Sequence, residues 1–157
     1  RITSNVVNAS SADYSAMIMD QAIASVPLKY RQQAAQMGQK HKFFAEDHAT
    51  EKWASSVGER QTPIGDKYSI EGGIPPRKGY AVEPVANLPV TAGSPNTAPA
   101  FFTPPRNLIM GVYKDLVIIP WDYPPELSMY MIVNMRLAFA VEQELAACKI
   151  TNVKAAL

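Results

Sequence analysis

The stretch from Met129 to Val141 constrains the fold of this chain more than any other. Its odd-numbered positions are all apolar, whereas the even-numbered positions include Asn134 and Arg136. Side chains of a β-strand alternate between two faces, so this two-residue period predicts a long strand with one wholly buried side and one mixed side. A buried helix remains the alternative, because good helix formers are plentiful from Met135 to Ala147.

Length and charge narrow the class of protein. A chain of 157 residues is normally one domain with a substantial core, and 47% hydrophobic residues suit a globular fold. The 15 basic and 14 acidic residues nearly cancel, which favours neither a specific nucleic-acid partner nor a membrane surface. No apolar run reaches the roughly 20 residues of a membrane span. The start at Arg1 instead of Met suggests a processed product or a fragment, and the single Cys148 excludes an internal disulfide.

Helical and strand patterns alternate along the rest of the chain, and nine of the 13 prolines lie between Pro84 and Pro125. Proline interrupts helices and central strands, so we expect that segment to be extended or irregular. The expected elements are a helix over Ser11–Val26, a strand over Lys40–Phe44, a helix over Glu46–Val57, a long loop over Gly58–Gly79, a strand over Tyr80–Val85, an irregular loop over Thr91–Pro105, short strands over Asn107–Gly111 and Leu116–Ile119, and a strand over Ala147–Val153 that pairs back on the long one.

A search for catalytic chemistry yields little. The sequence lacks the glycine-rich loops that cradle phosphates and the Gly-x-Ser-x-Gly turn of hydrolases. His41, His48 and Glu51 are the best candidate metal ligands, since His48 and Glu51 share a helix face at this spacing. A structural role for all three is the preferred interpretation, and Cys148 is expected to be a buried apolar thiol.

The order of several motifs resembles a known family. Val26-Pro27-Leu28-Lys29-Tyr30-Arg31 is followed by Glu59-Arg60-Gln61-Thr62, Gly79-Tyr80-Ala81-Val82 and Thr103-Pro104-Pro105-Arg106-Asn107, and then by the long strand with Arg136. Together they resemble the C-terminal part of a tailed-bacteriophage major capsid protein of the Hong Kong type, a fold that encapsulin shells share. The resemblance covers most of the chain.

The resemblance implies an α+β fold in which helices flank a mixed central sheet. An axial domain is expected over about residues 11–122, with strands over 123–157 returning to a peripheral domain. The family's N-terminal arm, extended hairpin and spine helix are expected to precede Arg1, so we do not expect these 157 residues to assemble shells unaided.

The function implied is structural, with no catalysis, cofactor or metal. Copies of the subunit would meet in pentamers and hexamers through the loop Gln61–Pro76, with Arg60, Asp66, Lys67 and Tyr68 as contact residues. No specific nucleic-acid sequence and no membrane is expected as partner, and the location is the virion after synthesis in the bacterial cytoplasm. The alternatives are an encapsulin-like shell enclosing cargo and, in another class, a small metal-dependent hydrolase using His41, His48 and Glu51.

Overall fold

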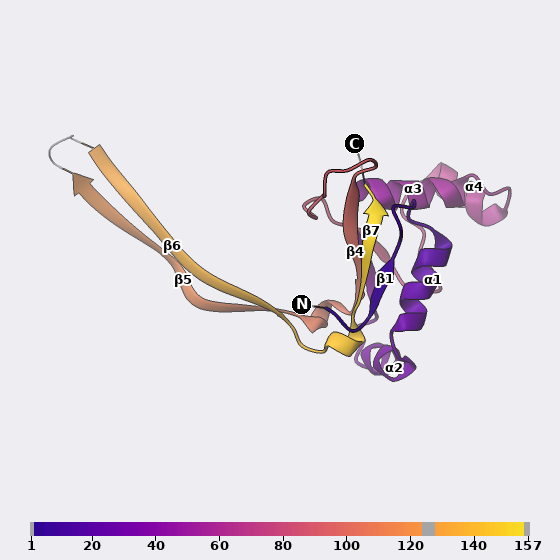
Figure 1. The fold of residues 1–157 in the computed structure, drawn as a ribbon, viewed down its shortest axis with the longest axis horizontal. Coiled ribbons are helices and arrows are strands. Elements are labelled where there is room, and N and C mark those ends of the chain that lie inside the picture. The colour runs from indigo at the N-terminus through magenta and orange to yellow at the C-terminus, as the bar shows by residue number, and fades with distance from the viewer. Residues whose placement is uncertain (1, 124–127, 156–157) are drawn as a thin grey trace. The chain divides into compact units, whose positions relative to one another are not determined.

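The computed structural model describes residues 2–123 and 128–155. They form two compact units, one made of residues 2–107 and 143–155 and the other of residues 108–123 and 128–142. Helices and strands are intermixed, so the predicted α+β class is confirmed (Figure 1). The elements are β1 (Val6–Asn8), α1 (Ala16–Ser25), α2 (Leu28–Gln36), β2 (Lys42–Ala45), α3 (Asp47–Gly58), α4 (Pro63–Glu71), β3 (Val82–Pro84), β4 (Thr97–Thr103), η1 (Pro105–Asn107), β5 (Leu108–Tyr123), β6 (Ser128–Val141), η3 (Glu144–Ala146) and β7 (Cys148–Lys154).

A mixed sheet organises the first unit. Its strand order in the described residues is β1-β7-β4-β2-β3, and the outer pairs β1–β7 and β2–β3 are parallel while β4 runs antiparallel to β2 and β7. The prediction that Ala147–Val153 pairs back on the long strand is therefore wrong. Strand β7 lies in this sheet because Cys148 and Ile150 alternate with polar residues and fit a face that is buried.

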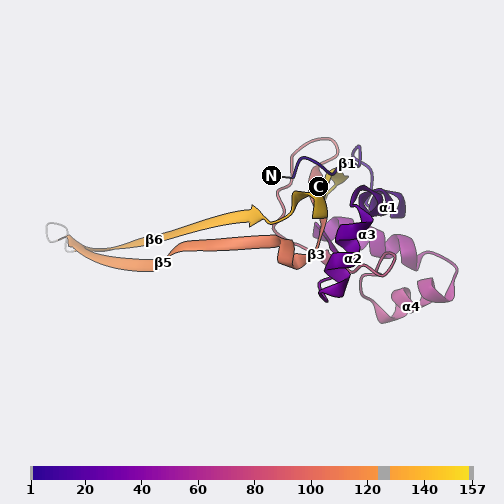
Figure 2. The same cartoon turned by 90° about the horizontal axis from the view of Figure 1, so that it is seen from below.

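The core lies between one face of this sheet and the helices. Phe43 of β2 stacks on Phe102 of β4 with ring centroids 4.5 Å apart, and Ile18 and Met19 of α1 and Trp53 of α3 pack into the same cluster. Within the first unit, Figures 1 and 2 show the helices gathered on one side of the five-stranded sheet.

Helix α1 begins later than the sequence predicted. Ser10 and Ser11 have φ values of 51° and 61°, which a helix does not allow. Their segment continues along β7, since the Ser11 amide donates to the Asn152 carbonyl at 2.8 Å. The pattern of buried residues nevertheless runs as predicted from Ile18 to Ile23.

Two helices were not predicted. The weak pattern after Pro27 becomes helix α2, which has only Ala34 buried, and the long loop contains helix α4. The signal for α4 is present at Thr62-Pro63, since Thr caps helix starts and proline suits the first helical position. By contrast, α3 begins where predicted, and the Glu46 side chain accepts a hydrogen bond from the Ala49 amide.

The irregular loop predicted over Thr91–Pro105 is instead a strand from Thr97 onward. Pro99 is tolerated because the β4–β7 register shifts between Ala98 and Ala100, where the ladder needs no donor from it. Phe102 is fully buried, whereas Phe101 is half-buried on the other face of the sheet.

The second unit is the β5–β6 hairpin, in which residues from Leu108 to Tyr123 pair with residues from Val141 back to Ser128. The strand prediction for Met129–Val141 is thus confirmed over the helical alternative. One continuous strand replaces the two short ones expected over 107–119, with register irregularities on either side of Lys114. Pro124 and Pro125, part of a predicted corner, lie outside the described residues.

The expected domain boundary near residue 122 also differs from the structure. Residue 122 lies within the hairpin, because β5 and β6 pair along their whole length, and β7 belongs to the sheet of the first unit. The separation falls after Asn107 and before Gln143. Which domain of a capsid subunit each unit represents stays a prediction.

Candidate intersubunit surface

The segment predicted to contact other subunits, Gln61–Pro76, is fixed to the first unit at its beginning by helix α4. The Thr62 hydroxyl accepts a hydrogen bond from the Gly65 amide at 3.2 Å and so caps the helix. A Cβ at Gly65 would lie 2.1 Å from the Arg60 carbonyl oxygen. Glycine therefore permits the close approach of α4 to the end of α3.

The end of the segment is fixed by a buried tryptophan. The Trp53 indole Nε1 donates to the Pro75 carbonyl at 2.8 Å, which satisfies a polar group that would otherwise be unpaired in the core. The Arg60 guanidinium lies over the same indole, 5.9 Å from its centroid. Trp53 thus ties the end of the segment to α3.

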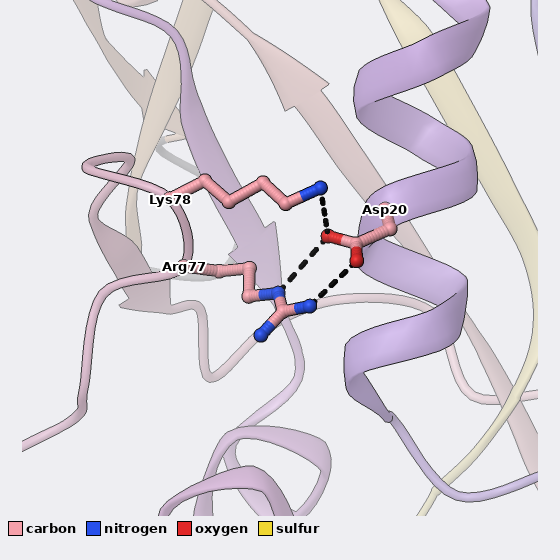
Figure 3. Close-up of polar contacts among 3 residues, drawn as sticks. All are labelled: Asp20, Arg77 and Lys78. Carbon is pink, nitrogen blue, oxygen red and sulfur yellow. Dashed lines mark hydrogen bonds and ion pairs between the residues drawn. The ribbon is translucent and has the colours of Figure 1, made fainter.

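A three-residue ion cluster joins the next turn to α1 (Figure 3). Arg77 donates to both Asp20 carboxylate oxygens at 3.0 and 2.5 Å, and Lys78 Nζ lies 3.2 Å from Oδ1. These hydrogen bonds, Arg77's first, hold the pKa of Asp20 below its usual value. Lys78 and Gly79 both have positive φ, and Arg77 and Tyr80 exchange two backbone bonds across this tight turn.

Three of the four predicted contact residues lie on helix α4, and Arg60 lies just before it, between α3 and α4. Asp66 and Lys67 are exposed on α4, where Lys67 lies 3.8 Å from Glu71. Tyr68 is half-buried and packs against the core cluster, so it supports the helix. Arg60 is exposed but bonds to the Ser56 carbonyl at 3.3 Å. Their role in subunit contact stays a prediction.

Two contact candidates escaped the sequence analysis. Ile64 and Ile70 on α4 are 64% and 84% exposed, and large apolar side chains this open are candidates for contact with another chain. The sequence signal for both residues was an isoleucine among the mostly polar residues of a short helix. It was hidden because the segment was interpreted as a loop.

The hairpin provides a larger apolar surface. Directly paired residues of an antiparallel ladder share a face. One face therefore carries Leu108, Met110, Val112, Ile118 and Pro120 of β5 together with Met131, Val133, Leu137, Phe139 and Val141 of β6. We call this the apolar hairpin face.

The apolar hairpin face was predicted to be wholly buried, and in the described residues it is not. The exposed fraction is 43% for Leu137, 60% for Val133 and 76% for Phe139. The alternation was correct, but a unit of two strands has no second layer to cover either side. The other face is mixed, with Arg136 and Asn134 beside alanines.

The candidate metal ligands do not form a site. His41 is fully buried, and its Nε2 lies 2.9 Å from the Ala146 carbonyl; Glu51 is exposed on α3, and His48 is half-buried. No group of three or more His, Cys, Asp or Glu side chains in the described part of the chain could hold a metal ion. Cys148 is buried as predicted, and burial raises the pKa of its thiol.

His41 has a packing role instead. Its ring lies 5.0 Å from that of Phe102 and 6.4 Å from that of Tyr80. Because the Ala146 carbonyl can only accept, Nε2 carries the proton, and the buried Nδ1 has no partner among the described residues. Burial, first of all, lowers the pKa of His41.

The chain is similar in sequence to one curated capsid protein. No family model matches the chain. Over 158 residues the chain is 29% identical to YqbE of Bacillus subtilis (strain 168), which is named as a prophage capsid protein, and the match covers 97% of this chain. The chain spans about half the length of that curated relative, 49%.

Solved capsid structures share the fold. A chain of the satellite phage P4 procapsid that includes the size determination protein matches with a TM-score of 0.61 at 15% identity, covering 97% of this chain and 43% of its own. A chain of an empty gene transfer agent capsid matches with a TM-score of 0.61 at 15% identity, and the match covers 97% of this chain and 55% of the capsid chain. A chain of the encapsulin complex of Synechococcus elongatus PCC 7942 matches with a TM-score of 0.57 at 12% identity, and the match covers 96% of this chain and 53% of the encapsulin chain.

The chain therefore has the fold that these phage capsid and encapsulin shell proteins share. At such identities the solved structures show the fold alone, and the prophage capsid protein supplies the likeness in sequence. The resemblance to tailed-phage major capsid proteins is confirmed. None of the described helices is long and apolar enough to cross a membrane.

Proposed function

We propose that this chain is part of a tailed-phage major capsid subunit, a structural protein that builds an icosahedral shell and performs no catalysis. Its partners are other copies of the subunit, arranged in pentamers and hexamers, and its location is the virion. The relative named as a prophage capsid protein supports the proposal, and so do the capsid structures with the same fold.

The apolar hairpin face carries this proposal. It exposes Met110, Met131 and Phe139 at 58%, 69% and 76%. A contiguous apolar surface of this length is unfavourable in water and marks a place where more polypeptide packs. A shell subunit supplies such cover, either from its own further residues or from a neighbouring copy. We assign residues 108–142 to the peripheral domain and the five-stranded unit to the axial domain.

The experiment uses the full-length subunit expressed alone and examined by electron microscopy. Phe139→Glu places a charge on the apolar hairpin face and is expected to abolish shells. Asn134→Glu places the same charge on the mixed face, five positions away on the same strand, and serves as the matched control. Shells of normal size from Phe139→Glu would contradict the role of this face, and a wild-type subunit that forms no particles would contradict the function.

An encapsulin-like shell that encloses cargo is the second candidate, because the encapsulin complex shares the fold with a TM-score of 0.57. The contents of purified particles distinguish the two. Packaged DNA supports the phage capsid, whereas a stoichiometric protein cargo supports the encapsulin.

A further inference from the structure

A groove of about 480 Å³ lies between the start of α1 and the second half of α3. Its lining includes Ser15, the residue before α1, and Met17 of α1, together with Lys52, Ser55 and Ser56 of α3 and Glu59, the residue after α3. Met17 is 68% exposed, so the groove offers one large apolar contact among polar and charged groups. All of these residues belong to the five-stranded unit.

Helix α4, on the same unit, has an exposed side that could enter such a groove on another copy. Its inner side is committed to its own chain, because Gly65 approaches the Arg60 carbonyl and Tyr68 packs on the core. Its outer side is open, with Ile70 84% exposed and Glu71 beside it. In Figure 2, α4 lies apart from α1 and α2.

The charges of the two surfaces also match. The groove is lined by two basic residues, Lys52 and Arg60, and two acidic ones, Asp13 and Glu59. The open side of α4 likewise carries both signs, with Glu71 and Lys67. The Lys67–Glu71 ion pair spans 3.8 Å with both side chains more than 60% exposed, so exchanging it for pairs with another molecule costs little.

We propose that the groove receives helix α4 of a second copy of this chain, with Ile70 seated against Met17 and Glu71 facing Lys52. Within one chain α4 is held at the end of α3, so the groove is left for a neighbour. The two surfaces differ, so the contact is head-to-tail and closes into a ring when the rotation between copies permits. The inference rests on the proposed function and names the surfaces that join axial units.

Disulfide trapping in assembled full-length particles tests this contact. Native Cys148 is fully buried, so Ser55→Cys and Ile70→Cys introduce accessible thiols on the two surfaces. Oxidised particles of the double variant are expected to give a ladder of covalent oligomers on non-reducing gels, whereas each single variant gives none. Gln33→Cys on exposed α2, combined with Ile70→Cys, is the matched control pair.

Each outcome bears on the inference. Normal particles without a ladder overturn the groove contact but leave the shell function intact, whereas a wild-type subunit that forms no particles contradicts the function itself. A ladder from Ile70→Cys alone indicates a symmetric contact and overturns the groove, as does an equal ladder from the control pair. If Ile70→Cys reduces particle yield, Glu71→Cys is paired with Ser55→Cys and the same ladder is expected.

Discussion

Asn107 and Gln143 close the base of the hairpin through two hydrogen bonds. The Asn107 Oδ1 accepts from the Gln143 amide at 2.7 Å, and Nδ2 donates to the Gln143 carbonyl at 3.0 Å and to Thr103 Oγ1 at 3.1 Å. Asn107 is only 4% exposed. One side chain therefore fixes the two chain segments that leave and re-enter the five-stranded unit.

Replacing this amide by a carboxylate is expected to destabilise the chain. Asn107→Asp keeps the acceptor for the Gln143 amide, but it removes the Nδ2 donor and directs a carboxylate at the Gln143 carbonyl. The expected loss is about 1–3 kcal/mol in the free energy of unfolding, measured by chemical denaturation near pH 7. Asn134→Asp on the exposed hairpin is the control and is expected to change little.

Lowering the pH tests the cause of that loss. Repulsion from the Gln143 carbonyl raises the folded-state pKa of the introduced carboxyl group above its unfolded value of about 4, so the stability gap between the Asn107→Asp variant and wild type is expected to narrow as the pH falls from 7 towards about 4, where the neutral acid regains an O–H donor. A gap that is unchanged from pH 7 to pH 3.5 would show that repulsion from the Gln143 carbonyl is not the reason.

The contact of Gly65 with the end of α3 predicts a second effect. A methyl group in Gly65→Ala would overlap the Arg60 carbonyl, so α4 must shift, and we expect a loss of about 1–3 kcal/mol. Faster hydrogen exchange in residues 63–71 would locate the change. Gly111→Ala is the control, since the nearest atom to its Cβ is 3.9 Å away. Equal effects from the two substitutions would contradict the prediction.

The sequence predicted those elements whose pattern is local and repeated. The alternation in Met129–Val141 identified β6, and the spacing of Ala49, Trp53 and Val57 identified α3. Strand β4 was missed because the prolines around it argue for a loop, and only its bulge at Pro99 makes that proline acceptable. Local composition does not encode a register shift.

The candidate surface was predicted only in outline. Asp66 and Lys67 were located on the segment 61–76 and Arg60 directly before it, but Ile64 and Ile70 were not recognised as exposed apolar residues. The long-range bonds that position the segment, Trp53 to Pro75 and Arg77 to Asp20, join residues 22 and 57 positions apart. Periodicity and capping rules act over a few residues and do not specify such partners.

The Asp20 cluster is expected to contribute modestly to stability. Its side chains are 25–56% exposed, so Asp20→Asn should cost less than about 1 kcal/mol. The folded-state pKa of Asp20 lies below the ordinary 3.8, so the contribution is present above that pH and lost as the pH falls below it. Denaturation should show a smaller difference from wild type at pH 2.5 than at pH 7. A difference of equal size at pH 2.5 would contradict the ionic origin.

Because His41 is buried, we expect the free energy of unfolding to fall on acidification, in a higher pH range than the effect of Asp20. Burial depresses its folded-state pKa below the ordinary 6.5, so below about pH 6.5 the unfolded chain binds a proton that the folded chain does not. Stability is therefore complete above that pH and decreases as the pH falls, by at most about 1.4 kcal/mol per pH unit for one proton.

The variant His41→Phe isolates this effect. It loses the hydrogen bond to Ala146 and should be less stable at pH 7, but its unfolding free energy should vary less than that of wild type between pH 7 and pH 5. His48→Ala leaves His41 in place and should keep the wild-type dependence. Parallel curves for His41→Phe and wild type would assign the acid sensitivity to other groups, whereas a flatter curve ties it to the unpartnered Nδ1 in the core.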